Sequence, residues 1–197
     1  MIKAKSFPCN TNLVSEKAFA NHIELYREYC VKCNEIYNFL KTGADKENSN
    51  KNFSVFRNPK VELGHNLNAT MLHESFFGNI GKTDNSIPQE TFLECVNEHF
   101  GGYEEWQKCF VASAKANRGW VVTALEQRTG MVMNYIIDNH DKGVLLNSYP
   151  ILILDCWEHA YMEDYGNDVD SYIEHFIKVV RWDVVEKRCE PIAESRD

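Results

Sequence analysis

Residues 15–41 form the longest helical pattern in this chain. Phe19 and Ile23 begin a series of apolar residues at three- and four-residue spacings, and Ser15 stands at the N-cap position. A second helical pattern follows at 61–77, after a polar loop. Two long helical patterns ahead of any strand pattern predict that the front of the chain is a helical hairpin.

Strand patterns occur only in the later part of the chain. Residues 120–126 and 130–137 are rich in Val, Met, Tyr and Ile and are separated by a Gln-Arg-Thr-Gly turn, which predicts a β-hairpin. A third strand is expected over 149–155. Further helices are expected over 89–99, 103–116, 168–179 and 183–188.

The order of these patterns predicts an α+β fold with two lobes. The first is an N-terminal helical hairpin lobe, and the second is a mixed lobe with a three-stranded antiparallel sheet flanked by helices. The linker at 78–88 is rich in turn residues. We therefore expect an N-terminal domain over 1–84 and a C-terminal domain over 85–197.

Charge and cysteine content narrow the classes of function. The formal net charge is -8, which argues against nucleic-acid binding because that needs a surplus of Lys and Arg. No apolar run approaches the ~20 residues that span a bilayer. The seven cysteines are an odd number and are scattered, so we expect reduced thiols and a cytoplasmic protein. Cys30 and Cys33 form a lone CxxC inside a helical pattern, where two packed thiols are a better interpretation than a redox or zinc pair.

One segment places metal-binding residue types at the end of a strand. Asp155 follows an apolar run and His159 stands four residues later. A carboxylate and an imidazole across a strand-to-helix turn can converge on one metal ion. The alternative is that Asp155 caps the next helix and His159 is a core residue.

This segment and several others resemble the iron/manganese superoxide dismutase family, in the same order along the chain. The family signature is similar to Asp155-x-Trp157-Glu158-His159-Ala160-Tyr161. Its second helix resembles the run from Leu63 to Phe77, which contains His73. Its later elements are similar to Phe100-Gly101-Gly102, to Arg118-Gly119-Trp120 and to the C-terminal helical patterns.

The resemblance implies a mononuclear Fe or Mn site with four protein ligands. His73, Asp155 and His159 match three of them. The fourth is a His of the first helix, eight residues before a Tyr that gates the substrate. The family also has an apolar residue three positions before this His, and aligning it with Phe19 selects His22. Counting eight residues back from Tyr29 instead selects Asn21. Neighbouring helix residues point about 100° apart, so both cannot face the metal without a local bulge. We take His22 as the expected ligand.

The resemblance also implies residues around the metal. Tyr29 matches the gating Tyr, and His140 takes the place of a Gln that tunes the metal in many relatives. A solvent-exposed loop His is the alternative for His140. Trp120 and Trp157 resemble the aromatic residues that exclude water from the site. Three other histidines are expected to be surface or packing residues: His65, His99 and His175.

Two departures from the family lie where its subunits meet. The family pairs a second His of the first helix with a Tyr of the partner subunit, and these positions here are Leu25, in the register that selects Asn21, and Met162. Glu158, which reaches across the dimer in the family, is present. A homodimer through the Glu158 region is therefore implied, with an apolar contact in place of the polar bridge.

The implied activity is dismutation of superoxide, a small anion, to O2 and H2O2. Two alternatives stay open at this point. If Asn21 replaces the fourth ligand, the remaining two His and one carboxylate match Fe(II) oxidases and oxygenases. The second alternative is a non-catalytic, dismutase-like subunit of a larger assembly. Basic residues near the C-terminus, Arg181, Lys187 and Arg188, are candidates for attracting the anion.

Overall fold

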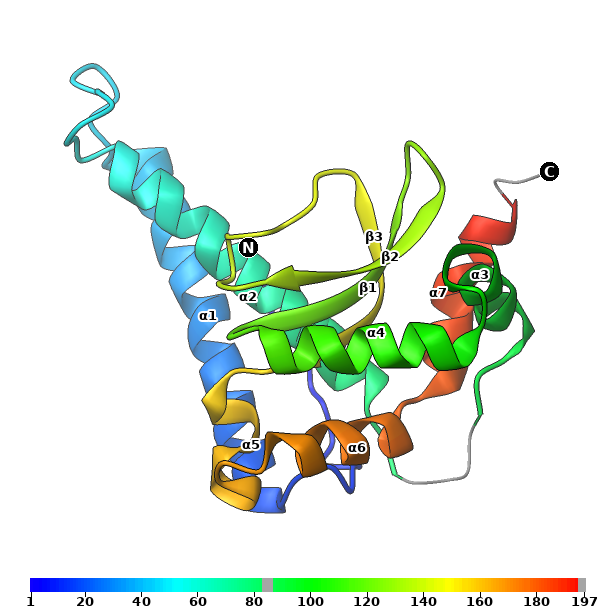
Figure 1. Cartoon of the computed structure of the whole chain (residues 1–197). Coiled ribbons are helices and arrows are strands. Elements are labelled where there is room, and N and C mark those ends of the chain that lie inside the picture. The colour runs from blue at the N-terminus through cyan, green and yellow to red at the C-terminus, as the bar shows by residue number, and fades with distance from the viewer. Residues whose placement is uncertain (83–86, 195–197) are drawn as a thin grey trace.

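The computed structural model describes residues 1–82 and 87–194 and has the predicted α+β architecture (Figure 1). Its elements are α1 (Glu16–Thr42), α2 (Arg57–Asn79), α3 (Glu90–Phe100), α4 (Tyr103–Ala116), β1 (Trp120–Glu126), β2 (Met131–Ile137), β3 (Ser148–Asp155), α5 (Glu158–Tyr165), α6 (Val169–Val179) and α7 (Trp182–Glu194). Two long helices precede a three-stranded antiparallel sheet with further helices around it. The predicted fold class is confirmed.

Helices α1 and α2 form the hairpin lobe. The hydroxyl of Ser15 accepts a hydrogen bond from the Ala18 amide at 3.2 Å, which caps the start of α1 as its sequence predicts. The buried face of α1 includes Phe19, Ile23 and Tyr26 and packs on α2. The apolar residues at these three- and four-residue spacings therefore form the face of α1 that contacts α2.

The sheet has the strand order β2-β1-β3, with both pairs antiparallel. In the register of the sheet, Trp120 at the start of β1 pairs with Ile137 of β2 and with Asp155 of β3. Just before it, a Cβ on Gly119 would lie 2.1 Å from the carbonyl oxygen of Ile137. Only glycine allows this close approach, which brings the end of β2 against the residue that precedes β1.

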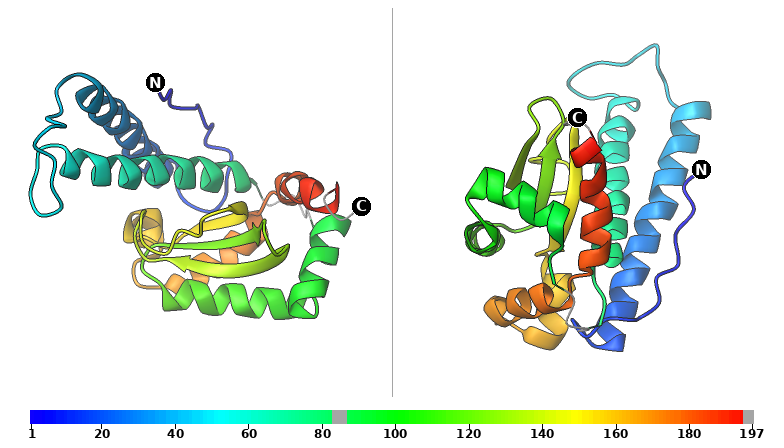
Figure 2. Two further views of the ribbon diagram at one scale, coloured as in Figure 1. Left: turned by 90° about the horizontal axis from the view of Figure 1, so that it is seen from above. Right: turned by 90° about the vertical axis from the view of Figure 1, so that its right-hand side faces the viewer.

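The sheet lies between the hairpin lobe and α4 (Figure 2). Helix α2 packs along β3, while α4 covers the opposite face at β1 and β2. The side chain of Asn79 joins the lobes, since it donates to the Ile153 carbonyl at 3.1 Å and accepts from the Ile153 amide at 3.0 Å. The Asn79 amide thus pairs with main-chain groups of β3 on the edge where, among the described residues, the sheet has no further strand.

Three details differ from the sequence prediction or lie beyond it. Helix α5 follows the strand-to-helix turn expected after Asp155, but its bounds were not predicted, and α7 is longer than the expected 183–188. Helix α2 starts earlier than residue 61. The expected domain boundary at 84 falls within 83–86, outside the described residues, and stays a prediction. Across the described ranges, no helix is long and apolar enough to cross a membrane.

Candidate metal centre

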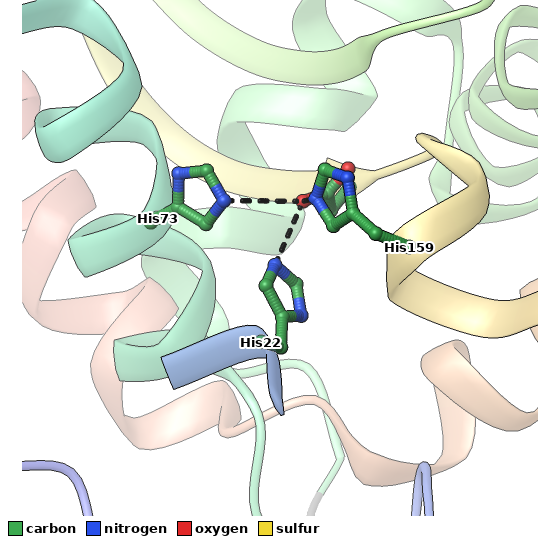
Figure 3. A group of neighbouring side chains, drawn as sticks. His22, His73 and His159 are labelled. Carbon is green, nitrogen blue, oxygen red and sulfur yellow. Dashed lines mark hydrogen bonds and ion pairs between the residues drawn. The ribbon is translucent and has the colours of Figure 1, made fainter. Parts of the chain in front are cut away.

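Four potential ligand side chains meet where the hairpin lobe contacts the mixed lobe (Figure 3). His22 comes from α1, His73 from α2, Asp155 from the end of β3 and His159 from the first turn of α5. One donor atom from each lies within 4.8 Å of the others. Two ligands of one first-row metal ion lie up to about 4.2 Å apart, because each is about 2.1 Å from the ion. A small contraction would let all four reach one ion.

Helix α1 directs His22, and not Asn21, into this cluster. His22 is 3% exposed and its Nε2 lies 3.1 Å from Asp155 Oδ2. Asn21 is exposed and donates to Glu163 Oε2 at 3.1 Å. All residues of Glu16–Thr42 are described, and they form α-helix throughout without a π turn.

The regular helix also explains why Tyr29 reaches the same site. His22 and Tyr29 are seven residues apart, and seven steps of about 100° come within about 20° of two full turns. The two side chains therefore share one face of a straight helix. The eight-residue spacing of the family would need an inserted residue in the helix, and this chain has the shorter spacing.

The carboxylate of Asp155 is fixed by main-chain contacts. Its Oδ1 accepts a hydrogen bond from the Trp157 amide at 2.9 Å, and the Tyr172 hydroxyl donates to its carbonyl at 2.8 Å. Oδ2 is left facing the Nε2 atoms of the three imidazoles, at 3.1 Å from His22, 3.2 Å from His159 and 3.8 Å from His73. One oxygen holds the side chain in place while the other points into the cluster.

Burial and mutual contact set the protonation states of these groups. Burial raises the pKa of Asp155, but the opposing effects of His159 and His22 are together larger and hold its pKa well below the ordinary value. Burial lowers the pKa of His22 and lowers the pKa of His73 to about 3, despite the nearby Asp155 carboxylate. At neutral pH, Asp155 is an anion, and His22 and His73 are neutral. Neutral imidazole and carboxylate are the forms that bind metal.

The orientation of His73 shows that these residues fit a cation. Its Nδ1 lies 2.7 Å from the Ala69 carbonyl oxygen and must donate to it, because a carbonyl only accepts. Nε2 of the neutral ring then carries a lone pair and no hydrogen. This atom is buried, has no hydrogen-bond partner among the described residues, and faces the Asp155 carboxylate. Two buried acceptors that face each other are stabilised by a positive ion between them.

Tyr29 and His140 form a hydrogen-bonded pair beside the cluster. The indole Nε1 of Trp120 donates to His140 Nδ1 at 3.0 Å, and His140 Nε2 lies 3.1 Å from the Tyr29 hydroxyl oxygen. Burial lowers the pKa of His140 to about 4, so the ring is neutral at pH 7. Because Nδ1 accepts, Nε2 carries the hydrogen and donates to Tyr29. The Tyr29 hydroxyl hydrogen therefore points elsewhere and can be donated within the site. His140 is 2% exposed, so the exposed-loop interpretation is wrong.

Aromatic rings enclose the cluster. The ring of Trp120 lies 4.9 Å from that of His73, and Trp157 stacks on His159 at 6.2 Å. Phe77 lies 4.9 Å from His22. These side chains replace water around the imidazoles with apolar surface, which strengthens electrostatic interactions inside the site.

His65 lies beside this site, where the sequence predicted only a surface or packing residue. Its ring centroid is 4.8 Å from that of His140 and 6.4 Å from that of Tyr29. Its Nδ1 lies 3.6 Å from Asp141 Oδ1. The sequence carries no signal for this position, because eight residues separate His65 from His73 and eight steps of about 100° leave the two side chains about 80° apart around α2.

The remaining predicted residues are placed as follows. The side chain of Arg188 is half-buried and donates to the carbonyl oxygens of Ile151 at 2.9 Å and Ser75 at 3.2 Å. These bonds hold α7 against β3 and α2, and attraction of an anion by Arg188 stays a prediction. Cys30 and Cys33 are both buried free thiols, as the packing interpretation predicts.

The surface next to His159 carries the residues expected at a subunit contact. The side chain of His159 is 30% exposed, Glu158 is exposed and Met162 is 38% exposed. A surface hollow of about 500 Å³ lies here, lined by Asn117, Arg118, Cys156, Trp157, Glu158, His159 and Tyr161. Leu25 is half-buried.

Comparison with known proteins agrees with this geometry. Residues 88–188 match the family model described as "Iron/manganese superoxide dismutases, C-terminal domain". The chain is 33% identical to "Superoxide dismutase [Fe]" of Aquifex aeolicus over 93% of this chain and 87% of that protein. It is 36% identical to "Superoxide dismutase [Mn] 1" of Halobacterium salinarum over 68% of this chain and 66% of that protein. It is also 31% identical to "Superoxide dismutase [Mn]" of Haloarcula marismortui over 86% and 82% of the two chains.

Proposed function

Because this chain belongs to the iron/manganese superoxide dismutase family, we propose that it converts superoxide to O2 and H2O2 at one iron or manganese ion. We further propose that His22, His73, Asp155 and His159 hold this ion. Three imidazoles and one carboxylate are a donor set that suits either metal.

The observation that carries this proposal is the arrangement around Asp155 Oδ2. Three imidazole Nε2 atoms converge on one carboxylate oxygen, and His73 presents an unpaired lone pair towards it. Without a cation, His22 and His159 can each donate from Nε2 to this oxygen, but His73 Nε2 and Asp155 Oδ2 face each other as two buried acceptors. A divalent or trivalent cation compensates all of them at once.

Dismutation consumes two superoxide ions and two protons, and yields one O2 and one H2O2. A bound iron or manganese ion supplies the one-electron exchange, since it alternates between two oxidation states. The chain's own residues set the surroundings of this exchange. The Asp155 carboxylate adds negative charge that favours the higher oxidation state, and its contact with the Trp157 amide fixes its orientation.

Tyr29 and His140 are proposed to handle protons and to position the substrate. His140 donates from Nε2 to the Tyr29 oxygen, which leaves the Tyr29 hydroxyl hydrogen free to be donated to a reduced oxygen species. The Trp120 indole keeps His140 in this tautomer. His140 thereby orients Tyr29.

A homodimer through the Glu158 region is also part of the proposal. Its support is that His159, a proposed ligand, is 30% exposed in the single chain, next to exposed Glu158 and Met162. A second copy on this face would cover the ligand and exclude water. A concentration series in analytical ultracentrifugation, with Glu158→Ala compared with wild type, tests this proposal. A wild-type monomer at all concentrations would contradict it.

The alternatives depended on an incomplete ligand set. The oxidase or oxygenase interpretation requires Asn21 in place of the fourth ligand, but Asn21 contacts Glu163 on the surface. The non-catalytic subunit interpretation requires broad loss of ligands, whereas four donors meet here. The seven free thiols support a reducing compartment, and we propose the cytoplasm.

Metal content together with superoxide loss tests the proposed function. The purified chain, loaded separately with iron and with manganese, is expected to bind about one ion per chain and to remove superoxide catalytically in a stopped-flow assay. Binding of an ion without accelerated superoxide loss, and with O2 uptake on an organic compound, would contradict dismutation and support an oxidase.

A further inference from the structure

A second histidine and carboxylate pair stands between solvent and the Tyr29–His140 pair. His65 lies on α2 and Asp141 in the segment after β2, with 3.6 Å between Nδ1 and Oδ1. The T-shaped contact of His65 with His140, at 4.8 Å between ring centroids, joins the two pairs. The groups that contact His65 are Tyr29 from α1, and His140 and Asp141 from the segment after β2.

Exposure decreases stepwise along this row of side chains. The side chains of Asp141 and His65 are 33% and 26% exposed. Tyr29 is half-buried, His140 is 2% exposed and His73 is fully buried. The row therefore runs from solvent to the ligand cluster through groups that can each donate or accept a hydrogen bond.

The proposed reaction needs such a route, because every H2O2 formed takes up two protons. Leu25 and Met162 have no ionisable group and cannot carry a proton. His65 is a suitable relay group, since an imidazole has two ring nitrogens and can accept a proton on one while it donates from the other. The Asp141 carboxylate, 3.6 Å from Nδ1, fixes the orientation of the ring.

We propose that His65, oriented by Asp141, delivers protons from solvent to Tyr29 and His140. This inference rests on the proposed dismutase function and adds to it the source of the protons. For each of the two protons that one H2O2 takes up, His65 takes a proton from solvent, passes it inward to the Tyr29 oxygen as Tyr29 donates its own proton to the peroxide, and returns to its starting form. The number of protons on the protein is unchanged after each transfer. His65 does not contact the ligand cluster, so it acts through Tyr29 and His140.

The test compares His65→Asn with wild type as metal-loaded full-length protein. Removing one proton-transfer group is expected to lower kcat about tenfold at saturating superoxide, while kcat/KM changes less than about twofold, because proton supply limits turnover only at high substrate. Imidazole in the buffer is expected to restore most of kcat, as an external proton donor replaces the missing ring. Metal content and the affinity for azide, a substrate-like anion measured by absorption, are expected to stay at wild-type values.

Two further variants complete the experiment. Asp141→Asn is expected to give a smaller fall in kcat, also restored by imidazole, because the ring is kept and only the carboxylate that orients it is lost. His99→Asn is the matched control. His99 donates to the Cys95 carbonyl on α3, so its removal should leave kcat unchanged.

The outcomes separate this inference from the proposed function. If His65→Asn has the kcat of wild type, or if imidazole does not restore a lowered kcat, the relay is refuted while dismutation stands. A loss of metal or of azide affinity would show that His65 maintains the structure of the site and would also refute the relay. If wild-type protein fails to remove superoxide, the proposed function fails first and this inference falls with it.

Discussion

At Asp155 a single side chain connects main-chain structure to the chemistry of the site. The Trp157 amide binds Oδ1, and three imidazoles surround Oδ2. The strand end therefore determines where the negative charge lies, and the helices bring neutral nitrogen donors to it. A ligand set built in this way depends on each helix presenting the correct residue.

The choice between His22 and Asn21 is testable at this scale. We expect His22→Ala to lose most of the bound metal and at least about 2 kcal/mol of metal-dependent stability, because a buried ligand is removed. Asn21→Ala should retain the metal, because it removes an exposed contact with Glu163. Metal content by atomic emission, after equal dialysis against a chelator, checks the pair. Metal loss in Asn21→Ala alone would overturn the assignment.

His140 makes a prediction about pH. Its pKa is about 4 in the folded protein and about 6.5 in the unfolded chain. Between these values the unfolded state binds a proton that the folded state does not, so the stability due to neutral His140 is complete above about 6.5 and is lost as pH falls towards 4.

Comparison of wild type with His140→Gln isolates this contribution. The Gln amide can still donate to Tyr29 but does not titrate. We expect Tm to fall less steeply from pH 7 to pH 4 in His140→Gln than in wild type, in thermal scans at equal metal content. Parallel curves for the two proteins would show that His140 does not titrate in this range.

Among the elements, those with strong apolar periodicity could be predicted from the sequence. The spacing of Phe19 and Ile23 predicts α1, and the Val- and Ile-rich runs predict the sheet. The bounds of α5 could not be predicted, because its eight residues carry little apolar pattern and Ala160 alone among them is buried. Its position depends on contacts with α1 and α6, which come from distant parts of the chain.

The candidate site also contains residues that could be predicted from the sequence and residues that could not. The resemblance supplied His73, Asp155 and His159, but it gave two registers for α1. The regular helix places His22 and Tyr29 on one face, and no local pattern reveals that one residue fewer separates them. His65 could not be found because its partners lie in a segment after β2 that reaches α2 only in three dimensions.

The attachment of β3 to α2 gives a prediction at the scale of elements. Asn79 makes two hydrogen bonds to the main chain of Ile153 and is fully buried. Asn79→Ala leaves a buried N–H and a buried C=O without partners, which costs about 3 kcal/mol. Tm is then expected to fall by roughly 6–12 °C. The matched control is Asn38→Ala, an exposed position on α1; an equal fall in both variants would contradict this role of Asn79.

For the whole molecule, the proposed ligands come from both lobes. His22 and His73 belong to the hairpin lobe, and Asp155 and His159 to the mixed lobe. A metal ion bound by all four stabilises the native state relative to the unfolded chain, by about 4 kcal/mol when free metal is 1,000 times its dissociation constant. The ion also holds the lobes together.

Removal of the metal should therefore lower the stability of both lobes at once. We expect a single unfolding transition in the loaded protein and a transition at least about 8 °C lower after chelation, since each kcal/mol corresponds to about 2–4 °C for a chain of this size. Differential scanning calorimetry checks this, and readdition of the metal should restore the original Tm. A Tm that is the same with and without the metal would contradict a site shared by the lobes.

The wide separation of these ligands along the chain has a consequence for biosynthesis. His22 and Asp155 are 133 residues apart, and His159 follows Asp155. A ribosome must therefore synthesise at least 133 further residues after His22 before Asp155 and His159 emerge, and the two helix histidines have no carboxylate partner during that time. A metal ion held by all four side chains can then be bound only after translation has passed His159.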